Sequence, residues 1–292
     1  MTDAILFMIL PFLACLLLVG INIYFGIHVI KREIIFIDIA MAQIAALGTT
    51  FSVVFPVELT SEWGVAEYTH GSNIEYYFSL VFVVLAAAAF TFLKSEKLAI
   101  PIEALIGIAY AVAATGAVIL IDKAAGGDVH VHEMLEGSIL WVTWGDILKL
   151  FIVFLLVGGF HYIFREKFFR LSDIYLESGS DKKVSALWDF LFYLTFGIVV
   201  VHAVNVGGIL TVFTFLIIPA SISILFAETW MSRILIGWVI GTIVTVCGLY
   251  LSWILDVPSS PTVILFLGVF LLLALVVKSL GFFKLKEKQA KG

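Results

Sequence analysis

Apolar runs, each long enough to cross a membrane, follow one another along the chain and are separated by short charged or turn-forming breaks. A membrane-spanning helix needs roughly 20 apolar residues. Nine such runs are present, at approximately 4–30, 34–56, 75–93, 98–121, 147–164, 184–204, 207–227, 234–255 and 262–281. Only 13% of the residues are charged and 62% are hydrophobic, so a soluble globule would expose large apolar patches. The sequence predicts an all-α polytopic membrane protein, a bundle of eight or nine transmembrane helices in a single domain over residues 1–292.

The break between the sixth and seventh runs is the shortest, at Asn205-Val206-Gly207-Gly208. Two glycines make a very short turn for two full spans, and unwound backbone inside a membrane is tolerated only where it is buried or lines a cavity. A broken or re-entrant helix at this position would reduce the count from nine spans to eight. The first run has no Lys or Arg before it and no small-residue cleavage site, so we expect a retained helix rather than a signal peptide.

Basic residues gather in alternate breaks. Of the 17 Lys and Arg residues, all but Lys123 and Lys149 follow or close the first, third, fifth, seventh and ninth runs. Because Lys and Arg favour the cytoplasmic side, this pattern predicts a multi-pass protein of the bacterial cytoplasmic membrane with its N-terminus outside and its C-terminus in the cytoplasm. The longest cytoplasmic loop, 165–183, has room for a short surface helix.

The motifs of an enzyme are missing from the sequence. It has no Gly-Lys pair and hence no Walker phosphate loop, and it has no His-Glu-x-x-His, Gly-x-Ser-x-Gly or cysteine–histidine cluster. We therefore expect no catalytic residue and no cofactor bound by this chain. If transport is driven by ATP, another subunit must bind the nucleotide.

Two polar residues lie inside the second run, where a polar group is costly and by default suggests function. Gln43 follows Arg32 by eleven residues, about 16 Å along a helix, near the bilayer midplane. Asp38 follows Arg32 by about 9 Å. Both are candidate metal-binding residues. The alternatives are a hydrogen bond between helices for Gln43 and an ion pair with the basic residues after the first run for Asp38.

Two further candidates, His202 and Asn205, stand beside the glycine break. An imidazole next to broken helix backbone is a plausible cation ligand, and the alternative is a histidine bonded to a loop carbonyl. In an outer loop, His130, His132 and Glu133 form a weak candidate for metal capture, with a solvated polar loop as the alternative.

A haem-binding membrane anchor of a redox complex is a competing hypothesis that uses His28, His161 and His202. Axial haem ligands must lie at matching depth on facing helices. The predicted topology puts His28 and His161 near the inner surface and His202 near the outer one, so only one pair is available. An ion-gradient-driven carrier is a third hypothesis, and it would transport without any ATPase.

Several segments resemble the permease subunits of bacterial metal ABC importers, the zinc/manganese/iron class also called ABC-3. Gly207–Val212 followed by Leu216–Ala220 resembles the glycine-to-"LIIPA" helix of that family, and Trp141–Asp146 resembles its "WVSWSDL" stretch. Pro258–Thr262 resembles the turn before the last helix. Asp38–Gly48 occupies the place of the family's "GDALSHAALPG", where the metal-associated Asp and His of the family fall on an isoleucine and on Gln43. The chain is similar to a divergent branch that reads "FVDIALAQIAALG".

The resemblance implies a membrane-spanning permease subunit of an ATP-driven importer for a divalent metal ion of the zinc, manganese or iron class. The implied partners are a cytoplasmic ABC ATPase, an extracytoplasmic metal-binding protein and a second permease copy in a homodimer, with no nucleic acid. The loop 165–183 sits where a coupling helix would meet the ATPase, and Phe168, Phe169 and Arg170 are the candidate contacts.

Overall fold

The computed structural model describes residues 2–54, 73–93, 100–121, 137, 139–176 and 185–290. In this part of the chain every regular element is a helix. The elements are α1 (Thr2–Lys31), α2 (Ile37–Val54), α4 (Asn73–Leu93), α5 (Ile102–Ile121), the short 3₁₀ helix η2 (Ile139–Trp141), α7 (Trp144–Ile163), α8 (Arg165–Leu176), α9 (Ala186–Gly207), α10 (Ile209–Phe226), α11 (Trp230–Leu255) and α12 (Ser259–Ala290).

Eight of the described helices are long and apolar enough to cross a membrane. They are α1, α4, α5, α7, α9, α10, α11 and α12, and they match eight of the nine predicted runs. The second run forms α2, whose apolar part, Ile37–Ser52, is shorter than these helices. The prediction of an all-helical, polytopic bundle with eight or nine spans is confirmed.

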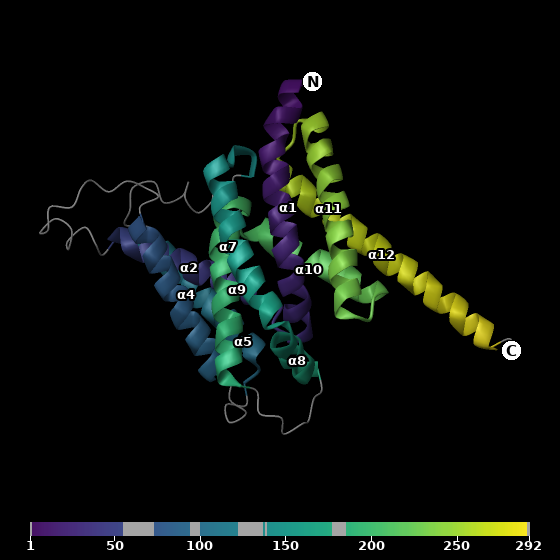
Figure 1. Ribbon diagram of the computed structural model, residues 1–292, viewed down its shortest axis with the longest axis horizontal. Helices are drawn as coiled ribbons and strands as arrows, with labels where there is room; N and C mark the ends of the chain where they lie inside the picture. Colours follow the sequence, from purple (N-terminus) through teal and green to yellow (C-terminus); the bar gives the residue numbers. More distant parts are fainter. Residues whose placement is uncertain are drawn as a thin grey trace, which may run out of the picture.

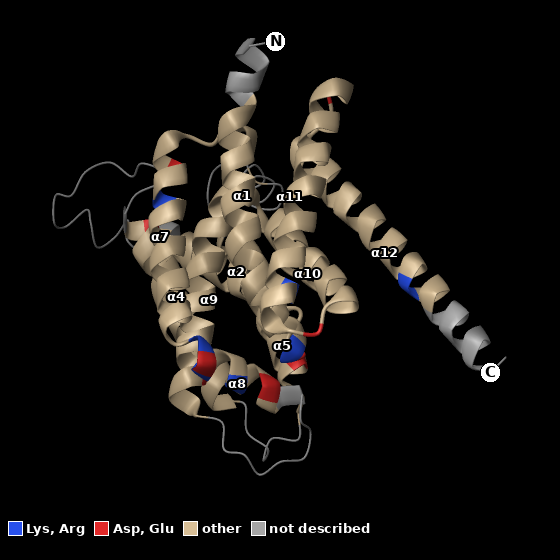
Figure 2. Ribbon diagram, turned by 45° about the vertical axis from the view of Figure 1, so that its right-hand side comes forward, with Lys and Arg blue, Asp and Glu red and all other residues tan. Residues whose placement is uncertain are grey.

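The helices form two groups joined by α9. On one side α2 packs against α4 and α5, and on the other α1 packs along α10 and α11, with α12 against α10 and α11. Helix α9 contacts α2, α4, α7 and α10, so it links the two groups (Figure 1). The predicted surface helix in the loop 165–183 is α8, which lies across one end of the bundle (Figure 2). We call this end, where α1 terminates, the α8 end.

The glycine break separates two complete helices. Helix α9 ends at Gly207 and α10 begins at Ile209, which leaves Gly208 alone between them with φ 73° and ψ 159°. That conformation is open essentially to glycine only. The backbone of Gly137 lies against the junction, because a Cβ on Gly137 would run into the backbone of Gly207 and Gly208. Gly208 therefore lets α9 and α10 meet with a single residue between them, and Gly137 lets another segment approach the backbone of that junction.

The start of α7 is fixed by a capping box. The Thr143 side chain accepts a hydrogen bond from the Asp146 backbone N–H at 3.3 Å, and Asp146 Oδ2 accepts one from the Thr143 backbone N–H at 3.0 Å. Each residue satisfies a backbone donor that the first helical turn leaves unpaired. Asp146, in the first turn of α7, thus has hydrogen-bond partners within the helix cap.

Candidate functional site

Asp38 lies in the first turn of α2 and is fully buried. Neither carboxylate oxygen has a hydrogen-bond partner among the described residues. The alternative of an ion pair with the basic residues after the first run is wrong, because Arg32 pairs with Asp189 and Lys31 with Asp173. The positive N-terminal end of the α2 dipole offsets part of the cost of burying a negative charge. A buried carboxylate with free oxygens remains a candidate cation ligand.

Gln43 does not join Asp38 in one site. Helix α2 is continuous from Ile37, so five residues rotate the two side chains by about 140° relative to each other. Asp38 is enclosed by the protein and Gln43 is partly exposed. Among the residues that the structure describes, no group of three or more His, Cys, Asp or Glu side chains could hold a metal ion. The predicted candidates therefore do not form a closed ligand shell in this conformation.

His202 connects two helices through both of its ring nitrogens. Nδ1 donates a hydrogen bond to the Ile198 carbonyl one turn back in α9, at 2.8 Å, and Nε2 lies 3.2 Å from the Tyr76 hydroxyl of α4. The alternative prediction, a histidine bonded to a backbone carbonyl, is therefore correct except that the carbonyl belongs to a helix and not to a loop. Asn205, near the end of α9, is exposed. The residues His130, His132 and Glu133, predicted to lie in an outer loop, are outside the described residues.

Two uncharged polar side chains inside the bundle were missed by the sequence reasoning. Asn22 in α1 is fully buried, and neither its amide nitrogen nor its amide oxygen has a hydrogen-bond partner among the described residues. The same holds for the hydroxyl of Thr211 in the first turn of α10. Buried polar groups are ordinarily hydrogen-bonded. The signal for Asn22 was present, since it interrupts an otherwise apolar run.

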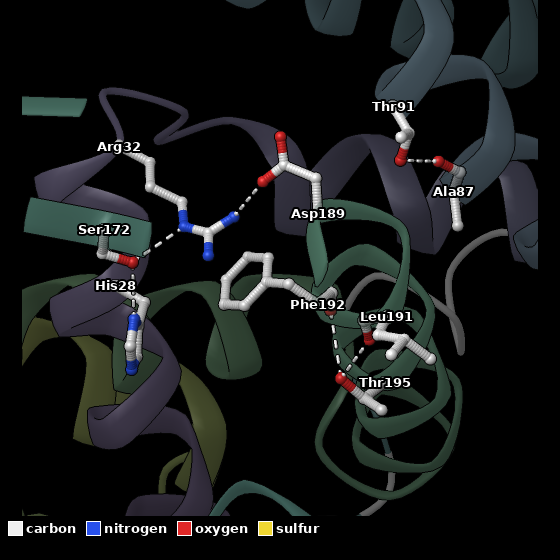
Figure 3. Close-up of polar contacts among 9 residues, drawn as sticks. All are labelled: His28, Arg32, Ala87, Thr91, Ser172, Asp189, Leu191, Phe192 and Thr195. Atoms are coloured by element: carbon white, nitrogen blue, oxygen red, sulfur yellow. Dashed lines mark hydrogen bonds and ion pairs between the residues drawn. The ribbon is translucent and has the colours of Figure 1, made fainter. Parts of the chain in front are cut away.

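A buried polar cluster lies where α1, α8 and α9 meet (Figure 3). Arg32 Nε donates to Ser172 Oγ at 2.9 Å and Arg32 Nη1 to Asp189 Oδ1 at 3.1 Å. Ser172 Oγ also lies 2.7 Å from His28 Nδ1. Sequence reasoning treated Arg32 as a sign of membrane orientation and as a possible partner of Asp38, and it did not predict the contacts with Ser172 and Asp189. The sequence does place polar residues at the ends of three helices that meet here. Nothing in its pattern indicates which of these residues pair.

The three predicted coupling residues have different environments. Phe168 is fully buried and stacks on His161, with ring centroids 3.9 Å apart. Phe169 is half-buried and stacks on Trp230 at 4.3 Å. Arg170 is exposed. The prediction that Phe168 faces another subunit is therefore wrong in this structure, because the ring anchors α8 to the bundle. Arg170 remains a candidate contact.

His28 and His161 are both buried at the α8 end, whereas we expected them at the membrane interface. Both rings contact Tyr24 edge-on. His161 uses both ring nitrogens in hydrogen bonds, Nδ1 to the Tyr24 hydroxyl at 2.9 Å and Nε2 to Thr195 Oγ1 at 2.8 Å. Both ring nitrogens of His161 therefore have partners, so this ring has no free nitrogen to bind a haem iron. The geometry of this pair therefore does not favour the haem hypothesis.

Residues 4–278 match the ABC 3 transport family. The chain belongs to this family. The family resemblance predicted from the glycine break and the "LIIPA"-like helix is thereby confirmed, and so is the prediction of a multi-pass protein of the bacterial inner membrane.

Two members with curated descriptions illustrate the relationship. The chain is 26% identical over 183 residues to a "Probable metal transport system membrane protein" of Chlamydia muridarum, and the match spans 60% of each chain. It is 25% identical over 206 residues to the "Manganese import system permease protein ScaB" of Streptococcus parasanguinis, spanning 68% of this chain and 70% of that one.

The fold is also similar to a solved structure, PsaBC from Streptococcus pneumoniae in complex with Fab. The TM-score is 0.70 at 21% sequence identity, and the match covers 92% of this chain and 90% of the other. At this identity the similarity establishes the fold. The structural similarity extends over almost the whole bundle, whereas the sequence matches to the two curated relatives cover a smaller part of the chain.

Proposed function

We propose that this chain is the membrane-spanning permease subunit of an ATP-driven importer for a divalent metal ion. The observation that carries the proposal is the family match over residues 4–278, and the metal transport and manganese import relatives support the substrate class. A separate ABC ATPase would hydrolyse ATP, an extracytoplasmic binding protein would deliver the metal, and a second copy of the chain would complete a homodimer. The competing carrier and haem-anchor hypotheses have no comparable support.

Within the zinc, manganese and iron class we favour manganese. The candidate contacts on α2 are oxygen donors, the carboxylate of Asp38 and the side-chain amide of Gln43. Carboxylate and carbonyl oxygens suit Mn²⁺, whereas imidazole and thiolate ligands suit Zn²⁺. Because the two side chains point in different directions from α2, we propose that they contact the ion in succession rather than together. His202 and Asn205 would lie along the outer part of the same route.

ATP would act through α8. This helix lies at the predicted cytoplasmic side of the bundle and has one face buried against it, through Phe168 and Ser172. Its opposite face exposes charged side chains, among them Arg170. An amphipathic helix with one packed and one solvent-exposed face is suited to contact a partner protein. ATP binding would bring the ATPase subunits together and move α8, which changes access to the metal route.

Reconstitution in proteoliposomes tests the proposed function. We expect the purified chain alone to hydrolyse no ATP above the background of empty vesicles. With its ATPase partner and metal-loaded binding protein, we expect ATP-dependent Mn²⁺ accumulation that stops when a non-hydrolysable ATP analogue replaces ATP. A chain that accumulates Mn²⁺ or Zn²⁺ without any ATPase, driven by an imposed proton or sodium gradient, would contradict the proposal and support a carrier.

A further inference from the structure

Arg32 is the residue at which three helices meet. It stands one residue beyond the end of α1, its side chain is fully buried, and it holds one residue of α8 and one of α9. We infer that Arg32 makes α8 move as one body with α1 and α9, so that it transmits a displacement of α8 into the bundle. This inference rests on the proposed function, because it takes α8 as the contact for the ATPase. It assigns Arg32 and Ser172 as positioning residues for transport.

The contacts of Arg32 use the directional donors of its guanidinium. Nε donates to Ser172 Oγ and Nη1 to Asp189 Oδ1, while the guanidinium carbon lies 3.6 Å from the centroid of the Phe192 ring. The guanidinium is planar and its donors are fixed relative to one another. A shift of α8 relative to α9 would therefore break at least one of the two hydrogen bonds rather than bend both.

A second, more exposed set of contacts beside Arg32 also attaches α8 to the end of α1. Lys31 forms an ion pair with Asp173 and lies 4.0 Å from the centroid of the Trp230 ring. Trp230 Nε1 donates to Asp173 Oδ2 at 3.3 Å. Two adjacent polar residues of α8, Ser172 and Asp173, thus bind Arg32 and Lys31, the adjacent basic residues at the end of α1. Because Trp230 opens α11, the attachment extends to a fourth helix.

Burial decides how α8 responds to an applied force. Separating a buried charge from its partners is far more costly than separating an exposed ion pair. Helix α8 is joined to Arg32 through Ser172, and these two residues are 2% and 0% exposed, so a displacement of α8 would have to break a buried, charge-assisted hydrogen bond before it left Arg32 behind. The buried Arg32–Asp189 pair then passes the displacement to α9. Helix α9 packs against α2. A displacement of α8 therefore reaches, through α9, the helix that carries Asp38.

The test compares metal uptake with ATP hydrolysis in the same proteoliposomes, using the chain with its ATPase, the binding protein and Mn²⁺. Ser172→Ala removes the hydroxyl that joins Arg32 to α8 and leaves the Arg32–Asp189 pair in place. Arg32→Lys keeps the positive charge and removes the forked donor geometry. For both variants we expect ATP hydrolysis to persist, while the Mn²⁺ taken up per ATP hydrolysed falls about tenfold.

Ser252→Ala is the matched control. Ser252 is also a buried serine, and its hydroxyl ties the end of α11 to Ser259 of α12 at 2.8 Å, at the end of the bundle opposite α8. We expect its Mn²⁺-to-ATP ratio to equal that of the wild type. This control separates the loss of a buried hydroxyl in general from the loss of the one that holds α8.

The ratio of Mn²⁺ taken up to ATP hydrolysed shows whether Arg32 and Ser172 transmit the movement of α8 or only support the fold. If uptake and hydrolysis fall in parallel in Ser172→Ala and Arg32→Lys, the two residues only support folding and the inference is wrong. It is also wrong if the wild type transports and both variants keep the wild-type ratio. If Arg32→Lys fails to fold, Ser172→Ala decides. A wild-type chain that accumulates no metal with its partners overturns the proposed function, and this inference with it.

Discussion

Replacing Asp38 by asparagine is expected to stabilise the folded chain and to abolish Mn²⁺ uptake. The carboxylate is fully buried and has no hydrogen-bond partner among the described residues, so its charge opposes folding. Asparagine keeps the shape and removes the charge. We expect a gain of about 1–3 kcal/mol in the free energy of unfolding, because leaving a buried charged group unpaired costs more than leaving a neutral amide unpaired. Thermal unfolding in detergent measures it.

The opposite signs of the two effects make the Asp38 prediction specific. A residue that serves packing alone lowers both stability and transport when it is replaced. A buried carboxylate that serves to bind a cation lowers the stability of the folded chain when no cation is bound. We therefore expect added Mn²⁺ to raise the unfolding temperature of the wild type and not that of Asp38→Asn, since a ligand at 100 times its Kd contributes about 2.7 kcal/mol.

Asp146→Asn provides the matched control for the Asp38 prediction. Asp146 also lies in the first turn of its helix, but its carboxylate accepts hydrogen bonds from the Thr143 backbone N–H and from the Thr143 hydroxyl. We expect the same substitution there to destabilise the chain, by about 0.3–1 kcal/mol, because it removes a negative charge that interacts favourably with the N-terminal end of the helix dipole, and to leave Mn²⁺ uptake intact. An Asp38→Asn chain that is less stable than the wild type, or that transports normally, would contradict the assignment of Asp38 as a cation contact.

The sequence determines the helices of this protein far better than their contacts. Apolar runs define the spans because each must satisfy its backbone within the membrane, and the glycine pair correctly indicated the junction at Gly208. The same runs are apolar on almost every side. Hydrophobic periodicity therefore gives little indication of which face of α9 meets α4 and which meets α10, and the partners of buried polar groups could not be assigned.

The α8 end shows what additional signal was available. In a helix from Arg165, the residues Phe168, Leu171 and Ser172 fall on one face at a spacing of three and four, and Arg170 falls on another. That spacing predicts an inward Phe168, which the structure shows. The Arg32–Asp189 pair is different, because 157 residues separate its members along the chain. No local pattern connects such residues, so the pairing depends on the three-dimensional packing.

Replacing Gly26 by alanine is expected to have the largest effect on the packing of the bundle. A Cβ at Gly26 would collide with the backbone carbonyl of Leu216 and lie 3.0 Å from the Cβ of Ala220. Small residues allow membrane helices to approach this closely. Because a backbone carbonyl cannot rotate away, α1 and α10 would have to separate. We expect a loss of about 1–3 kcal/mol in the free energy of unfolding, measured by thermal unfolding in detergent.

Gly20→Ala in the same helix is the control, because no atom lies within 4 Å of the Cβ position at Gly20. Alanine is the better helix former, so this variant should be as stable as the wild type or up to about 1 kcal/mol more stable. Equal stability of the two variants would show that α1 and α10 pack less closely than described. Gly26 lies six residues before Arg32 in the same segment. If the Gly26→Ala chain folds and keeps the wild-type ratio of Mn²⁺ taken up to ATP hydrolysed, close packing of α1 against α10 is not required for coupling through Arg32.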